Sequence, residues 1–129
     1  MRRWLPILAA ALLAGCGGSP GDLLSIEVSG GPAKRKQAIV VQNDGQATCN
    51  GGPSQDIGSD ALIDAREIER ELGDDAERAA VYEGTRGDAT NYVARTKDGT
   101  VRWDDRAPGR PAVLSKAQLF ALQQGRKLC

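Results

Sequence analysis

Two short turn signals, each placed between stretches of alternating apolar and polar residues, constrain the fold of this chain most strongly. Asn-Asp-Gly at residues 43–45 and Asp-Gly at residues 98–99 are typical of tight β-hairpins. The first joins a strand predicted over residues 37–42 to a return strand over residues 46–49. The second joins a strand over residues 91–96 to a return strand that includes residues 101–103. Because hairpins pair neighbouring strands in opposite directions, they predict an antiparallel sheet.

A further strand is predicted near the start of the folded part of the chain. Leu24, Ile26 and Val28 alternate with polar residues, which is the period-two pattern of a strand with one buried face. Ile39 and Val41 alternate in the same way in the strand before the first turn. These patterns assign one face of each strand to the core.

Two helices are predicted from their capping signals. Ser59 is a favourable N-cap for a helix from Asp60, and Gly73 is a favourable stop. Ser115 and Gln118 have the spacing of a capping box, which begins a last helix. The expected apolar stripe of the first helix is Leu62, Ala65, Ile68 and Leu72. The expected apolar residues of the last helix are Leu119, Phe120 and Leu122.

Strands interleaved with two amphipathic helices indicate an α+β fold. The expected architecture is a small antiparallel sheet of about four to five strands, with two hairpins, packed on one face by the two helices. Residues 104–111 are predicted to be irregular, because two prolines and a glycine in this stretch disfavour regular structure.

The first residues have the layout of a secretory signal. Arg2 and Arg3 precede an apolar run over residues 5–14, and small residues follow it. The run is shorter than the roughly 20 residues that span a bilayer, which argues against a transmembrane anchor. A plain secretory signal remains the alternative to a lipoprotein signal. Gly-Gly-Ser-Pro-Gly at residues 17–21 is typical of a flexible tether between an anchor and a folded domain.

Leu-Ala-Gly-Cys at residues 13–16 resembles the lipobox of bacterial lipoproteins. The resemblance implies cleavage before Cys16 and a diacylglycerol on its sulfur, and it allows a third acyl chain, with palmitate as an expected lipid. It divides the chain into a signal peptide (1–15), a tether (16–22) and a single domain (23–129). The expected location is the extracytoplasmic face of the cell membrane. In a cell with two membranes, Gly17 after the cysteine resembles the pattern that directs lipoproteins to the outer membrane.

The chain has three cysteines, and the lipobox resemblance assigns one of them to lipid. The remaining pair, Cys49 and Cys129, belongs to an exported chain, in which disulfides form and persist. A redox or metal site is the alternative, but the chain has no Cys-x-x-Cys motif and no histidine. A structural disulfide between these two residues is therefore predicted.

The charge balance argues against a nucleic-acid partner. The chain has seventeen basic and seventeen acidic residues, and removal of Arg2 and Arg3 with the signal leaves a small acidic excess. A nucleic-acid-binding surface requires a basic excess. The basic residues at 34–36 are interpreted as a solvated turn, although they also suit anionic headgroups.

The sequence predicts neither an enzyme nor a cofactor. It has no histidine, no nucleophile elbow and no phosphate-binding glycine loop. The acidic pairs at 74–75 and 104–105 lack the spacing of a calcium loop and are interpreted as solvated surface charge. No metal site is predicted.

Trp103 and Arg106 are the candidate partner contacts. Trp103 is either a core residue that pairs with Tyr92 across the hairpin or an exposed aromatic beside Arg106, and the sequence leaves both open. Loops on a rigid scaffold often carry recognition, which favours residues 29–36, 50–58 and 106–111 as contact segments.

The order of elements also resembles the emfourin protease inhibitors. The resemblance rests on a first strand that runs into Ser29-Gly30-Gly31, a middle helix, a strand containing Tyr92 with an Asp-Gly turn, then a proline and a closing helix. It covers most of the domain and implies inhibition of a protease. It rests on the order of elements and a few common residues, and no inhibitory residues are assigned from it.

These observations favour a lipid-anchored, non-catalytic binding module of a bacterial envelope. Its expected partners are the membrane, through the anchor, and an envelope protein. The first alternative is an inhibitor of an exported protease. The second is an envelope enzyme that uses only carboxylates; a glycosidase of this kind requires two carboxylates that face each other across a cleft, about 5 to 9 Å apart.

Overall fold

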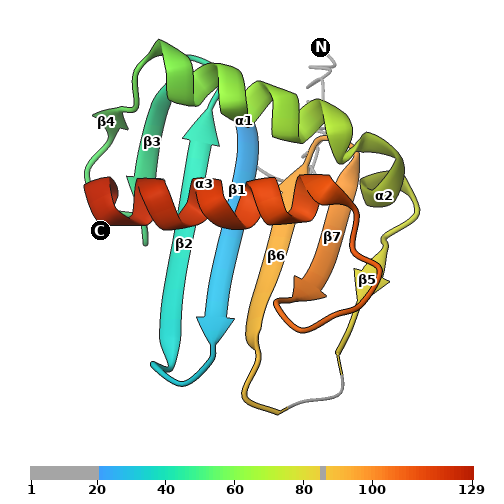
Figure 1. Ribbon diagram of the computed structural model, residues 1–129. Coiled ribbons are helices and arrows are strands. Elements are labelled where there is room, and N and C mark those ends of the chain that lie inside the picture. The colour runs from blue at the N-terminus through green and yellow to red at the C-terminus, as the bar shows by residue number, and fades with distance from the viewer. Residues whose placement is uncertain (1–20, 85–86) are drawn as a thin grey trace, which may run out of the picture.

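Both predicted hairpins form in the protein, whose computed structural model describes residues 21–84 and 87–129 (Figure 1). Within these ranges lie seven strands and three helices, so the fold is α+β as predicted. The strands are β1 (Asp22–Gly30), β2 (Arg35–Gln42), β3 (Gln46–Cys49), β4 (Gln55–Asp56), β5 (Val81–Tyr82), β6 (Thr90–Thr96) and β7 (Gly99–Asp104). The helices are α1 (Ser59–Glu71), α2 (Gly73–Glu77) and α3 (Ala112–Leu128).

The strands form one sheet in the order β4-β3-β2-β1-β6-β7-β5. The central strand β1 pairs antiparallel with β2 and with β6, so Ile26 lies opposite Ile39 on one side and Ala94 on the other. At one edge, β5 pairs with β7 in parallel. The sheet is therefore mixed and has more strands than the sequence predicts.

The two strands that the sequence does not reveal are the edge strands. β4 and β5 are each two residues long, too short to show an alternating pattern. Gln55 and Asp56 are also polar and exposed. The chain reaches β5 from α2 and runs alongside β7 before it turns back into β6, which makes the β5–β7 pairing parallel.

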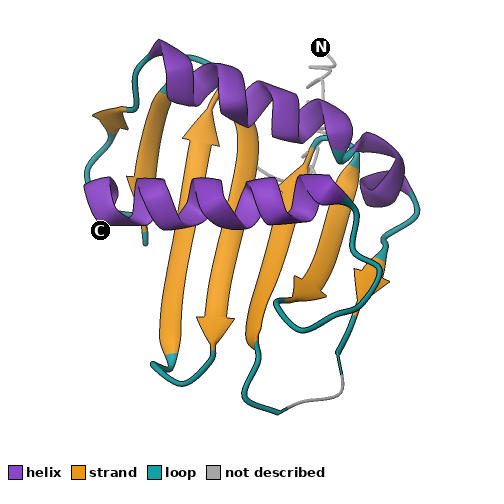
Figure 2. Cartoon of the chain, viewed as in Figure 1, coloured by secondary structure: helices purple, strands orange, loops and turns teal. Residues whose placement is uncertain are grey.

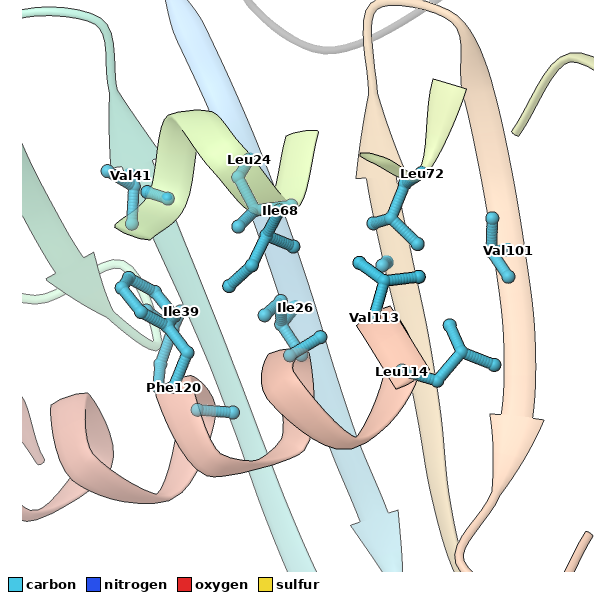
Figure 3. Close-up of a cluster of buried hydrophobic side chains, with 14 of the residues drawn as sticks. Leu24, Ile26, Ile39, Val41, Ile68, Leu72, Val101, Val113, Leu114 and Phe120 are labelled. Atoms are coloured by element: carbon cyan, nitrogen blue, oxygen red, sulfur yellow. The ribbon is translucent and has the colours of Figure 1, made fainter. Parts of the chain in front are cut away.

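The two long helices, α1 and α3, lie side by side across the same face of the sheet, as predicted (Figure 2). Large apolar side chains from the sheet and from both helices meet between these layers (Figure 3). Burial of one such side chain contributes about 1.5–3 kcal/mol relative to exposure, so this layer drives folding. The largest fully buried side chains are those of Leu24, Ile26, Ile39, Ile68, Leu72, Leu114, Val41 and Val101.

Both helices begin earlier than their capping signals predict. The N-cap of α1 is Gly58, with a φ of 84°, and no side chain caps this end. Ser59 is the first residue inside the helix. α3 begins at Ala112 after the N-cap Pro111, so Ser115 lies in the first turns and not at a capping box. Proline is favourable at a helix start because its φ is already helical and its missing N–H is not needed there.

The buried face of α3 differs from the predicted one. Phe120 is buried, but Leu119 and Leu122 are 54% and 37% exposed. Small residues, including Ala117 and Ala121, face the sheet in their place. They let the helix approach the strands closely: a Cβ added at Gly125 would lie 3.0 Å from Oε1 of Gln37. A prediction that weights large apolar residues most heavily therefore selects the wrong flank of this helix.

A disulfide joins Cys49 at the end of β3 to Cys129 directly after α3, consistent with the prediction. Their Cα atoms are 5.6 Å apart, and 80 positions separate them in sequence. The bridge fastens the C-terminal end of α3 to the sheet.

The N-terminal predictions concern residues that the structure mostly does not describe. Cys16, the signal peptide and most of the tether lie outside the described residues. β1 begins at Asp22, at the end of the predicted tether. Among residues 21–84 and 87–129, no helix is both long and apolar enough to cross a membrane.

Candidate functional site

Trp103 is a core residue, so it is not the exposed aromatic that the sequence left open as an alternative. Its side chain is 2% exposed and lies on the face of β7 that the helices cover. The ring stacks on Tyr92 with 5.3 Å between centroids, the cross-strand pairing that the sequence left open. Its Nε1 donates a hydrogen bond of 2.9 Å to Oε1 of Gln118 on α3.

Arg106, the other predicted contact, is exposed on the loop between β7 and α3. The loop is held by Asp104, whose carboxylate accepts hydrogen bonds from the backbone N–H of Arg106 (2.8 Å) and of Gly84 (2.6 Å). Asp104 is buried, so its interpretation as solvated surface charge is wrong. Buried carboxylates need such donors, and here the donors fix two loops at once.

Arg110 continues this network toward α3. Its Nη1 donates to the carbonyl oxygen of Asp104 (3.2 Å) and to Oε1 of Gln118 (2.8 Å). The Gln118 oxygen thus accepts hydrogen bonds from both Arg110 and the indole of Trp103. The loop, the helix and the sheet are therefore held in one arrangement at this end of the molecule.

Two of the three predicted contact loops lie at the same end of the sheet (Figure 1). The β1–β2 turn reaches the segment before β6 through a hydrogen bond from the N–H of Gly31 to the carbonyl of Ala89 (3.2 Å). The same segment reaches the β7–α3 loop, because the N–H of Asp105 donates to the carbonyl of Thr90 (3.0 Å). The third predicted segment, residues 50–58, lies instead at the β4 edge of the sheet.

A groove of about 280 Å³ opens beside α3 at the loop end of the sheet. We call it the α3 groove. It is lined by Val28, Arg35, Gln37, Tyr92, Ser115, Gln118, Leu119, Ala121 and Leu122. Strands β1, β2 and β6 supply one side, and α3 supplies the other. Leu119 and Leu122, which the sequence assigned to the core, form its exposed apolar part.

The polar groups around the α3 groove are cationic and neutral. The lining residues include one cation, Arg35, and no acidic residue. Burial raises the pKa of Tyr92, and the nearby carboxylate of Asp105 adds to the increase, while Arg35 and Arg110 oppose it. The Tyr92 hydroxyl therefore stays protonated at neutral pH. Besides Tyr92, four of the nine lining residues are polar or charged, so the groove offers a mixed surface on which polar groups can orient a partner.

A second, larger cavity of about 730 Å³ lies at the opposite end of the sheet, where β1 begins. Its cationic lining residues are Arg66, Arg70, Arg95 and Lys97, and its acidic ones are Asp22 and Glu69. Its remaining lining residues are Gly21, Leu23, Ser25, Val40, Asn43 and Thr96. We call it the root cavity, because it is lined by Gly21 and Asp22, where the described part of the domain begins.

Neither cavity has the ligands of a metal centre. Over the described ranges, no cluster of three or more histidine, cysteine, aspartate or glutamate side chains is arranged to hold a metal ion. Comparisons of the chain with protein-family models, with curated proteins and with solved structures found no match.

Proposed function

We propose that the protein is a lipid-anchored binding module on the extracytoplasmic face of a bacterial membrane, without catalytic activity, and that the α3 groove receives its partner. One observation carries the proposal: Leu119 and Leu122 are exposed side by side on α3 at a groove that has a polar rim. Burial of one leucine side chain is worth about 1.5–3 kcal/mol, so a partner that covers both gains substantial affinity.

The chemistry of the groove suggests what the partner presents. Val28, Leu119 and Leu122 suit an apolar side chain. Arg35 and the Tyr92 hydroxyl suit a carboxylate or a carbonyl next to that side chain. A segment of an envelope protein with an apolar residue beside an acidic one meets both requirements.

The anchor supports this function through local concentration. A lipid on Cys16 confines the module to the plane of the membrane, which raises its effective concentration toward other envelope components. A groove of modest affinity is then sufficient. The β1–β2 turn and the β7–α3 loop beside the groove are already held by hydrogen bonds. Little conformational entropy is therefore lost when a partner binds, which also favours affinity.

A second candidate is an inhibitor of an exported protease, which the emfourin resemblance implies. The observation that favours it is the β7–α3 loop, where Arg106, Pro108 and Gly109 are exposed. Asp104 and Arg110 hold this loop from beneath. A rigid exposed loop suits an inhibitor, since it loses little conformational freedom when a protease binds it.

A photo-crosslinking amino acid placed at position 119 in intact cells tests the groove. We expect it to crosslink to one envelope protein, whereas the same probe at position 63 does not. The control is closely matched, because Leu119 is 54% and Ile63 is 59% exposed on helices of the same layer. Leu122→Ser should lower the crosslink yield from position 119 by roughly tenfold, as expected for a lost leucine contact.

Other crosslinking patterns decide against the groove. Equal crosslinks from positions 119 and 63 mean that the contacts are nonspecific. A probe at position 108 that captures an exported protease, with none captured from position 119, favours the inhibitor.

A further inference from the structure

Gly21, the residue just before β1, is held in place by hydrogen bonds. The carbonyl oxygen of Gly21 accepts hydrogen bonds from both the backbone N–H (2.7 Å) and the side-chain Nδ2 (2.9 Å) of Asn43. Nη2 of Arg66 on α1 donates to the carbonyl oxygen of Asn43 (3.2 Å). These hydrogen bonds fix the start of β1 to the β2–β3 turn and to α1. A force on the chain before Gly21 is therefore transmitted to the domain as a whole.

The root cavity beside this residue is enriched in cations that come from three elements. α1 contributes Arg66 and Arg70, which lie one turn apart on the same side of the helix. β6 contributes Arg95, and the β6–β7 turn contributes Lys97.

The carboxylates near the root cavity neutralise only part of this charge. Nη1 of Arg95 is 2.7 Å from Oε1 of Glu27 on the neighbouring strand. Nζ of Lys97 is 3.9 Å from Oε1 of Glu69, and the Lys97 side chain remains 76% exposed. Both cations remain substantially exposed to water, and ion pairs of exposed side chains are weak.

We propose that the root cavity binds the phosphate of an anionic phospholipid headgroup in the membrane that holds the anchor. The inference rests on the proposed lipid at Cys16. From Cys16 to Gly21 the chain spans at most about 18 Å, because an extended residue covers about 3.3–3.6 Å. The cavity is therefore held within reach of the headgroup layer.

The chemistry of the cations suits this ligand. A guanidinium group binds phosphate oxygens through two parallel hydrogen bonds, and the root cavity contains three arginines. Near an anionic membrane, each lysine or arginine strengthens attraction by roughly fivefold. The anchor supplies the headgroups at high local concentration, which a dissolved phosphate ion lacks.

Docking of the root cavity gives the molecule an orientation. β1 begins at the root cavity with Asp22 and passes the α3 groove at Val28. Asp22 and Val28 are about 20 Å apart along the strand, at the usual rise of about 3.3 Å per residue. When the root cavity contacts the headgroups, the α3 groove, the β1–β2 turn and the β7–α3 loop face away from the membrane, where a partner can reach them.

The test uses the mature lipidated protein in nanodiscs, with lysine acylation rates read by mass spectrometry. Discs of phosphatidylcholine alone are compared with discs that also contain phosphatidylglycerol. We expect phosphatidylglycerol to slow the acylation of Lys97 by roughly fivefold or more, as for loss of a cation to the surface. The acylation of Lys34 and Lys36, on and beside the turn at the far end of the sheet, should not change.

Variants locate the effect. Arg70→Gln leaves the Arg66–Asn43 hydrogen bond intact and should remove most of the protection of Lys97. Arg66→Gln combined with Arg70→Gln should abolish it. Arg126→Gln, an exposed cation near the end of α3, is the matched control and should leave the protection unchanged.

Three results would overturn the inference. Lys97 acylation that is equal in both discs shows that no anionic headgroup is bound. If inorganic phosphate added to phosphatidylcholine discs slows Lys97 acylation as much as phosphatidylglycerol does, the root cavity is a site for free phosphate. Slowing that survives the double arginine variant shows simple attraction to the surface. If Cys16 carries no lipid, the protein does not co-elute with the discs at all, which separates failure of the anchor from failure of this site.

Discussion

Replacement of Cys49 and Cys129 together by alanine is expected to lower the free energy of unfolding by about 4.5 kcal/mol. The bridge joins residues 80 positions apart, and the chain-entropy estimate for a loop of that length gives this value. The loss is large for a single domain, whose total stability is typically about 5–15 kcal/mol. The end of α3 should lose its protection first, because the bridge fastens this end to β3.

Urea unfolding followed by circular dichroism measures this effect. The wild-type protein kept reduced is the control, and its unfolding midpoint should match that of the double variant. A double variant that loses less than about 1 kcal/mol would show that the bridge constrains the unfolded chain little.

Trp103→Ala is expected to lower the free energy of unfolding by about 3–5 kcal/mol, because it empties a large volume in the core. It removes the stacking on Tyr92 and the hydrogen bond to Gln118. Trp103→Phe is the informative control. It keeps an aromatic ring and should cost less, although it loses the Nε1 hydrogen bond, itself worth about 1 kcal/mol.

The same urea titration, read by near-ultraviolet circular dichroism, measures both Trp103 variants. If Trp103→Ala costs less than about 1 kcal/mol, the indole is not packed in the core. The exposed aromatic contact that the sequence left open would then be the better interpretation.

The central part of the sheet is predictable because its signals are local. The turn sequences at residues 43–45 and 98–99 strongly favour a tight hairpin over other local structures. Alternation in β1 and β2 also assigns the buried faces correctly: Ile26 and Ile39 lie opposite each other in the core. In such stretches, the backbone and the hydrophobic pattern specify the same structure.

The parts that sequence does not reveal depend on tertiary contacts. β5 forms because β7 offers it an edge, and its two residues carry no pattern of their own. Asp104 looks like any surface acid until Gly84, twenty positions earlier in sequence, donates a hydrogen bond to it. Neither feature has a local signal that a sequence pattern detects.

The α3 groove illustrates the same limit for function. The sequence places Leu119 in the core because leucine is large and apolar, yet small residues such as Ala117 take the buried positions. Close approach of the helix to the sheet selects small side chains for the inner face. The sign of the groove is the exposure of two leucines on α3. That exposure can be recognised only after the helix is placed on the sheet.

The proposed function depends most directly on the chemistry at Cys16, which lies outside the described residues. The decisive measurement is the mass of the N-terminal peptide of the protein extracted from the cell envelope. We predict a peptide that begins at Cys16 and carries a diacylglycerol, and we predict that Cys16→Ser yields protein that is released from the membrane or left unprocessed. A mature peptide that begins elsewhere without lipid, or a Cys16→Ser variant that is cleaved and retained normally, would contradict the account.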